Sequence, residues 1–284
     1  MLGKMRTVVT QTLLAGVAAF LLCGFAVAQK SGEPRSAQSF YNRGLAEMKY
    51  GECDAALEDF DRAIELDPRD ARFYKDRGRC LSTLHRDEAL SDINKAIELR
   101  PGYAQAYAAR GSYYIQKELV SFANDDTKTG FEFHSKALAD LDRSIALDPR
   151  CAECYIARAD LWPKSESARL LADINKAVEL APTNTVYLDR RARFYVGSGE
   201  YQKSIADCDA ILKINRRDYS ALTLRGQNYS RLKDYRKAVN DYTRALQIEP
   251  KLSILLLTLR SQAYRALGNT AQAEADERNA KKPQ

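Results

Sequence analysis

The stretch ALEDFDRAIELDP, residues 56–68, indicates the fold because its pattern returns three more times in this chain. Its apolar side chains are spaced so that they share one face of an α-helix, and a proline then ends the helix. The close copies are ALSDINKAIELRP (89–101), ALADLDRSIALDP (137–149) and AVNDYTRALQIEP (238–250). A recurring amphipathic helix predicts an all-α protein built from one repeated unit.

A second helical segment precedes each of these copies and carries a glycine, which lets two packed helices approach closely. These segments are FYNRGLAEM (40–48), FYKDRGRCL (73–81), AYAARGSYY (106–114) and LTLRGQNYS (222–230). Weaker copies of the same helix pair occupy residues 155–182, 187–215 and 257–280. The sequence therefore predicts about seven helix pairs.

With this period the chain resembles the tetratricopeptide repeat family over residues 37–280. The resemblance implies a right-handed α-solenoid of stacked antiparallel helix pairs, with a concave groove lined by the first helix of each pair. Arg216 replaces the terminal proline of the fifth copy, and Leu170 and Ser204 occupy the usual small-residue slot of their second helices. A single helix pair cannot hide its apolar face, so the copies must stack. The last helix has Glu277 at a position that is apolar in other copies, so we expect it to close the stack.

The N-terminus differs in composition from the rest of the chain. Lys4 and Arg6 precede an apolar run from Leu13 to Ala28, and this run ends in small residues. A basic start, an apolar stretch and a small-residue end predict a signal peptide at residues 1–28. We therefore expect an exported protein, placed most simply in a bacterial periplasm. The run is shorter than the roughly 20 residues that span a bilayer, which favours a cleaved signal over a membrane anchor. A membrane anchor at residues 7–28 is the alternative.

After this signal we expect a short linker at 29–36, the helix pairs at 37–280 and a polar tail at 281–284.

Two charged columns run through the predicted repeats. The residue before each small slot is an arginine, and each second helix has an aspartate three residues after its small slot. The arginines are Arg43, Arg77, Arg110, Arg158, Arg191, Arg225 and Arg260, and the aspartates are Asp59, Asp92, Asp140, Asp173, Asp207, Asp241 and Asp276. The arginines lie on the apolar stripe, so we interpret the columns as structural ion pairs rather than a ligand site.

The cysteines leave several interpretations open. Cys151 and Cys154 form a C-x-x-C pair at a repeat junction, which could be two ordinary thiols, a structural disulfide or a redox dithiol. Haem attachment would need a following histidine, and structural zinc needs four ligands. Cys53 begins a second helix and Cys80 lies on the next first helix. These helices pack together in the family, so the resemblance makes a Cys53–Cys80 disulfide possible. Cys208 takes a core position and should be a buried thiol.

The third copy has about 14 extra residues between its two helices, and we place this insertion near 118–133. NDDTKTG (124–130) predicts a turn or loop. Phe122, Phe131 and Phe133 must pack somewhere, either back on their own repeat or against a partner. A metal site formed by Asp125, Asp126 and His134 is a weaker third possibility.

First-helix positions off the apolar stripe are the predicted partner-binding groove. They are Tyr41, Lys75, Arg79, Ser112, Gln116, Asp160, Arg193 and Gln227. Some relatives hold acidic peptide tails with a clamp of lysines, asparagines and an arginine. Lys75 fits the first clamp slot, but Arg79 and the later slots do not, so the class of peptide stays open.

The composition favours an interaction protein over an enzyme. The net charge is +6, with acidic and basic residues mixed, and gives no case for nucleic-acid binding. The sequence shows no catalytic triad, phosphate-binding loop or metal cluster, and it implies no cofactor and no small-molecule substrate. We therefore predict a non-catalytic exported scaffold that binds protein or peptide partners, and that meets a membrane only if the signal stays uncleaved. A thiol–disulfide redox protein acting through Cys151 and Cys154 is the alternative.

Overall fold

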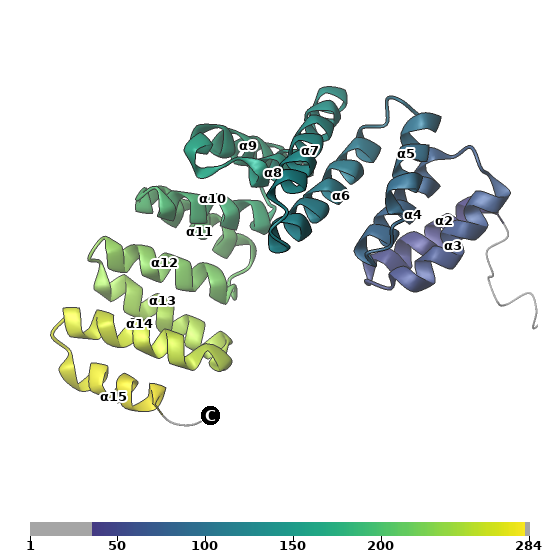
Figure 1. Cartoon of the computed structure of the whole chain (residues 1–284). Helices are drawn as coiled ribbons and strands as arrows, with labels where there is room; N and C mark the ends of the chain where they lie inside the picture. The colour runs from purple at the N-terminus through teal and green to yellow at the C-terminus, as the bar shows by residue number, and fades with distance from the viewer. Residues whose placement is uncertain (1–35, 282–284) are drawn as a thin grey trace, which may run out of the picture. The chain divides into compact units, whose positions relative to one another are not determined.

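The computed structural model describes residues 36–281, which divide into two compact units, residues 36–100 and 101–281 (Figure 1). The predicted signal peptide and nearly all of the predicted linker lie outside the described residues. Every regular element between residues 36 and 281 is helical, and this part of the chain contains no β-strand.

The first unit contains two antiparallel helix pairs. They are α2 (Ala37–Lys49) with α3 (Cys53–Leu66), and α4 (Ala71–Thr83) with α5 (Ala89–Leu99). Helix α3 also packs on α4, which joins the two pairs. Phe60, Phe73 and Ile93 are completely or almost completely buried in this unit. Phe60 on α3 and Ile93 on α5 belong to the apolar stripe that the sequence predicts for the second helices, and Phe73 adds to the core from α4.

The second unit stacks five further pairs in chain order (Figure 1). They are α6 (Ala104–Ala123) with α7 (Thr127–Leu147), α8 (Ala152–Leu161) with α9 (Ser167–Leu180), α10 (Thr185–Gly197) with α11 (Tyr201–Ile214), α12 (Tyr219–Arg231) with α13 (Tyr235–Ile248), and α14 (Ser253–Ala266) with α15 (Thr270–Ala280). Short 3-10 helices η1 (Lys164–Glu166) and η2 (Pro250–Leu252) precede α9 and α14. One apolar core, including Ile174, Leu222 and Tyr242, runs through successive pairs. The predicted fold class, an all-α solenoid of stacked antiparallel helix pairs, is confirmed.

Local sequence signals explain where the helices begin and turn. Asp70, Asn184 and Asp218 cap helices α4, α10 and α12 by accepting a hydrogen bond from a backbone N–H of the first turn. A residue with positive φ lies in the turn inside most pairs; these residues are Gly51, His85, Asp125, Gly199, Lys233 and Gly268. The α8–α9 turn differs, because Pro163 and η1 connect its helices.

The insertion of the third pair is helical, which corrects the predicted loop. It lengthens α6 to 20 residues and α7 to 21 residues, and only residues 124–126 form the turn between them. The backbone N–H of Thr129 donates to Oδ1 of Asp126 at 3.1 Å, so the segment expected to be a loop instead begins α7. The tip folds back on its own repeat. The Phe122 and Phe131 rings meet edge to face with centroids 5.4 Å apart, and the Tyr114 and Phe133 rings stack at 5.9 Å.

Candidate functional site

The two charged columns form an arginine–aspartate ladder, as predicted. In each pair the arginine donates from Nε and Nη2 to both carboxylate oxygens of the aspartate on the second helix; Arg225 does so to Asp241 at 2.8 and 2.7 Å. The same two-bond arrangement joins Arg43–Asp59, Arg77–Asp92, Arg110–Asp140, Arg158–Asp173, Arg191–Asp207 and Arg260–Asp276. The aspartate side chains are almost completely buried, so the ladder holds helices together and is not open to a ligand.

Several ladder arginines also reach the preceding pair, a connection that the sequence reasoning missed. Nη1 donates from Arg77 to Asp61, from Arg158 to Asp142 and from Arg225 to Asp209 at 2.6–2.7 Å, and from Arg191 to Asn175 and from Arg260 to Thr243 at 3.2 and 3.0 Å. Each acceptor lies two residues after the ladder aspartate of the earlier pair, a column that is polar throughout. The hydrogen bonds to the ladder aspartates of their own pairs are the main cause that raises the pKa of Arg77, Arg158 and Arg225. Burial opposes this rise, and the bonds to the preceding pair add to it.

The predicted groove positions separate into two groups. Arg79, Ser112, Gln116, Asp160 and Arg193 are exposed, and Gln227 is half-buried. Tyr41 and Lys75 are only 7% and 9% exposed, so their assignment to an open groove surface is wrong.

The buried carboxylate of Asp76 explains why these two side chains turn inward. Asp76 accepts a hydrogen bond from Oη of Tyr41 at 2.7 Å, and its Oδ1 lies 2.7 Å from Nζ of Lys75 and 3.3 Å from Nη1 of Arg79. Burial lowers the pKa of Lys75, although the charge of Asp76 acts in the opposite direction. A buried carboxylate needs such donors, so these side chains neutralise Asp76 and only Arg79 of the four remains well exposed.

In the second unit, the charged groove positions are already paired. Asp160 forms an ion pair with Arg190 on α10. Nε of Arg193 donates to Asp189 at 2.6 Å, and Nη2 donates to Ser220 at 3.2 Å. The remaining predicted positions there, Ser112, Gln116 and Gln227, are uncharged. This face therefore offers a partner little unbalanced charge.

The projecting end of the α6–α7 hairpin carries a more distinctive surface. Leu119 is 64% exposed and Phe131 is 65% exposed. The ring of Phe131 contacts that of Phe122, and Leu119 lies one helical turn before Phe122 on α6. Ile115 and Leu138, which continue the same two stripes toward the base, pack in one cluster with Leu161 of α8. We call Leu119, Phe122 and Phe131 the hairpin flank.

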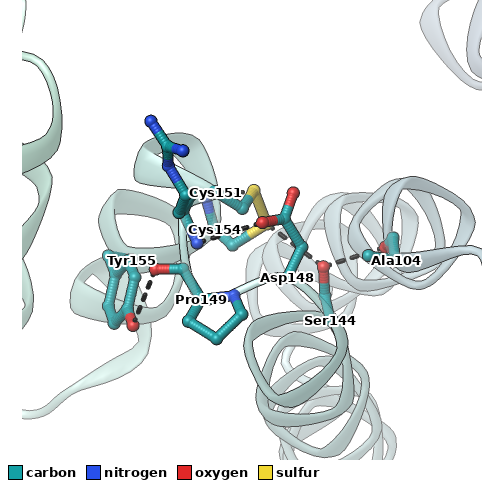
Figure 2. The surroundings of a disulfide bond; sticks show 8 residues. Ala104, Ser144, Asp148, Pro149, Cys151, Cys154 and Tyr155 are labelled. Atoms are coloured by element: carbon teal, nitrogen blue, oxygen red, sulfur yellow. Dashed lines mark hydrogen bonds between the residues drawn. A yellow bond between two sulfur atoms is a disulfide. The ribbon is translucent and has the colours of Figure 1, made fainter.

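The C-x-x-C pair forms a disulfide bond between Cys151 and Cys154, one of the three alternatives left by the sequence (Figure 2). Cys151 precedes the first residue of α8, and its Sγ accepts a hydrogen bond from the backbone N–H of Cys154 at 3.2 Å. The buried Sγ of Cys154 lies 3.2 Å from Oγ of Ser144, and that hydroxyl is 2.8 Å from the carbonyl oxygen of Ala104, to which it donates. The bond therefore sits where α6, α7 and α8 meet.

The other cysteines within residues 36–281, Cys53, Cys80 and Cys208, are free, buried thiols. The disulfide between Cys53 and Cys80 that the resemblance made possible is not formed in this structure. Cys208 is fully buried as predicted, and burial raises the pKa of its thiol to about 12.

One polar hollow of about 350 Å³ lies in the first unit, between the α3–α4 turn and the end of α5. Arg69, Arg72 and Arg100 line it together with Asp67 and Asp70. Burial acts to raise the pKa of Asp70, but its hydrogen bonds with Arg72 outweigh this effect and hold the pKa below its usual value. The hollow contains none of the predicted groove residues.

Two further expectations concern metal ions and membranes. Between residues 36 and 281 no three His, Cys, Asp or Glu side chains are grouped to hold a metal ion, and Nδ1 of His134 instead lies 2.9 Å from a carboxylate oxygen of Glu118. The structure therefore does not assemble the suggested site of Asp125, Asp126 and His134. Across the same described range, each helix is too short or too polar to span a bilayer.

Comparison with known sequences identifies two segments of this chain as repeats of a known family. Family models described as tetratricopeptide repeat match residues 37–70 and 219–252. A curated mouse protein, tetratricopeptide repeat protein 12, is 33% identical over 84 residues. That alignment covers 28% of this chain and only 12% of the relative, so this chain spans a small part of the mouse protein.

Solved structures show the same fold at low sequence identity. The protein titled pilF from Pseudomonas aeruginosa superposes with a TM-score of 0.61 at 14% identity, over 81% of this chain and 97% of that one. TTC0263, a repeat protein from Thermus thermophilus, gives 0.57 at 22% identity, over 69% and 99%. YrrB, described as having an unusual peptide-binding site, gives 0.53 at 21% identity, over 75% and 99%. The chain thus carries tetratricopeptide repeats, matched at residues 37–70 and 219–252, and its helix pairs have the fold of tetratricopeptide repeat proteins.

Proposed function

We propose that this protein is a non-catalytic, exported scaffold that binds a protein partner through the hairpin flank and through exposed first-helix positions. Repeats of this family generally mediate protein or peptide binding, which supports the general role. The observation that carries the specific proposal is the exposure of Leu119 and Phe131 on the projecting hairpin. The comparisons give no support to a redox role for Cys151 and Cys154.

The hairpin flank projects because its own pair is longer than the next one. Helices α6 and α7 have 20 and 21 residues, whereas α8 and α9 have 10 and 14. At 1.5 Å per residue, the extra turns carry the tip about 10 Å beyond the neighbouring pair. Near the base, Ile115 and Leu138 are covered by α8, but the same stripes continue uncovered at Leu119 and Phe131.

The chemistry of a suitable partner follows from what covers the lower part of these stripes. Near the base of the hairpin, helix α8 packs on these stripes and contributes Leu161 and Ala157 to the apolar cluster that includes Ile115 and Leu138. A helix with a similar apolar stripe would extend this packing over the hairpin flank in the way that amphipathic helices bind apolar grooves. Lys128 is exposed one turn from Phe131, so an acidic side chain beside the partner's stripe would complement it.

The first-helix positions provide a second, more polar surface. Ser112, Gln116 and Gln227 carry uncharged hydrogen-bonding groups, and Arg79 adds an exposed cation in the first unit. The description of YrrB mentions a peptide-binding site on this fold, which makes a peptide ligand reasonable here as well. This mixed surface does not indicate one particular peptide class.

Export is proposed from the N-terminal sequence alone. The basic residues, apolar run and small-residue end of residues 1–28 predict cleavage after Ala28. Intact mass and N-terminal sequencing of the protein from the extracellular or periplasmic fraction should show a chain that begins at Gln29. A chain that keeps residues 7–28 and sediments with membranes would support the anchored alternative instead.

The hairpin flank is tested by affinity capture with point variants from extracts of cells that make the protein. Leu119→Asp and Phe131→Asp place a charge on the flank, and we expect each to weaken capture of the partner at least tenfold, because a buried charge opposes apolar packing. Ala139→Asp, at another exposed position of α7, is the matched control and should capture normally. Circular dichroism should show unchanged helicity in all three variants. Equal capture by wild type, Leu119→Asp and Phe131→Asp would remove the flank from the proposed function.

A further inference from the structure

The polar hollow of the first unit brings together arginines from two neighbouring helix pairs. Arg69 lies in the turn between α3 and α4, Arg72 lies in the first turn of α4, and Arg100 follows the last residue of α5. Asp67 and Asp70 line the same hollow, so the arginines outnumber the carboxylates by one. The proposed partner surface uses none of these side chains.

Both aspartates of the hollow already accept hydrogen bonds from the chain around them. The two carboxylate oxygens of Asp70 accept from Nε of Arg72, each at 3.0 Å. Oδ1 of Asp67 accepts from the backbone N–H of Arg69 at 3.2 Å. Within residues 36–281, the exposed guanidinium of Arg69 has no hydrogen-bond or ion-pair partner of its own. The hollow therefore keeps cationic groups that an anion can reach.

Arg72 forms a fixed wall of the hollow. Besides its bonds to Asp70, its Nη2 donates to Oε1 of Gln38 at 2.9 Å, and its Cζ lies 5.3 Å from the ring centroid of Tyr41. A guanidinium held at both its edge and its face loses little further freedom when a ligand binds beside it. Arg100, on the other side of the hollow, is exposed.

The turn between α7 and α8 shows that the arginine cluster is not a by-product of the repeat. The sequence DPR occurs both at 67–69 and at 148–150, and in each copy the arginine donates its backbone N–H to the aspartate. The two positions that complete the hollow hold Arg72 and Arg100 beside the first turn, but Glu153 and Ala181 beside the second. Only the first of these two turns therefore gathers three arginines.

We propose that Arg69, Arg72 and Arg100 form a binding site for a phosphate group. The planar fork of a guanidinium donates two parallel hydrogen bonds to phosphate. Phosphate oxygens point in several directions and can accept from more than one arginine, whereas the two oxygens of a carboxylate lie in one plane. Inorganic phosphate and the headgroup of an anionic phospholipid both carry this group.

Isothermal titration calorimetry of the purified protein with inorganic phosphate, at low ionic strength, tests the site. Arg100→Asp is the variant of choice because Asp67 and Asp148 occupy the corresponding positions of other copies, so the fold should accept it. Arg150→Asp makes the same change of charge in the second DPR turn and is the matched control. We expect Arg100→Asp to weaken phosphate binding at least about tenfold and Arg150→Asp to leave it unchanged. Circular dichroism should show equal helicity in both variants.

Co-sedimentation with phosphatidylcholine vesicles, with and without phosphatidylglycerol, distinguishes the two sources of the phosphate group. Sedimentation that requires phosphatidylglycerol and is lost in Arg100→Asp, but not in Arg150→Asp, would identify a lipid headgroup. Phosphate binding without sedimentation would identify a soluble phosphate. If neither probe binds, or if Arg100→Asp binds both as well as the wild type does, the proposal is wrong.

Discussion

At the scale of single residues, the stability of the stack depends on the arginine–aspartate ladder. Each arginine bonds the aspartate of its own pair, and several also bond the pair before it, so one side chain fixes three helices. The sequence predicted the ladder because both columns recur in every copy. It did not predict that Tyr41 and Lys75 are buried. Their orientation depends on the tertiary position of Asp76, which carries no repeating signal.

Replacing a ladder arginine should therefore be costly. Arg225→Ala leaves the buried Asp241 without its main partner, and we expect the free energy of unfolding to fall by about 3 kcal/mol. Arg236→Ala, an exposed position on the following helix, is the matched control and should change it by less than about 0.5 kcal/mol. Urea denaturation followed by circular dichroism measures both, and equal midpoints for the two variants would contradict the structural role of the ladder.

At the scale of helices, close contact inside four of the pairs depends on a glycine of the first helix, Gly44, Gly78, Gly111 or Gly226. A Cβ atom at Gly226 would lie 2.7 Å from the ring of Tyr242, which is almost completely buried and has little freedom to move. The sequence predicted this contact from the recurring small residue. The extended hairpin was less predictable, because NDDTKTG contains both turn residues and an aspartate that can cap a helix.

The glycine contact predicts opposite behaviour at two helical positions. Gly226→Ala should lower the thermal midpoint, with a loss of about 1–3 kcal/mol, because the added methyl group overpacks the core. Gly197→Ala, at the end of α10, has no atom within 4 Å of the new methyl group and should be neutral or slightly stabilising. Differential scanning calorimetry compares the two, and a neutral Gly226→Ala would mean that the α12–α13 packing is looser than described.

At the scale of the whole molecule, the chain consists of two compact units whose helices contact mainly their sequence neighbours. The helix pairs and fold class could be predicted because burial in a repeat array depends on nearest neighbours and leaves a periodic sequence signal. Partner surfaces occur once and leave no such signal. Leu119 and Phe131 can be recognised as exposed only when the lengths of α6 and α7 are compared with those of α8 and α9.

Because the chain divides into two units, we expect a destabilising substitution in one unit to leave the stability of the other unchanged. In hydrogen–deuterium exchange, Arg225→Ala should speed exchange in α11–α14, which pack around it, because stability in a repeat array is a sum of neighbouring terms. Exchange in α2–α5 should match that of the wild type. Faster exchange throughout the first unit would show that the two units unfold as one.

The central claim is that the hairpin flank binds a helix of another protein, and photo-crosslinking tests it most directly. A photoreactive amino acid is placed at Phe131, or at the control position Ala139, and illuminated in cells that make the protein. We predict one defined crosslinked protein from position 131, joined through an amphipathic helix, which is absent from position 139 and lost when Leu119→Asp is added. No crosslink at position 131, or the same crosslinks from both positions, would contradict the account.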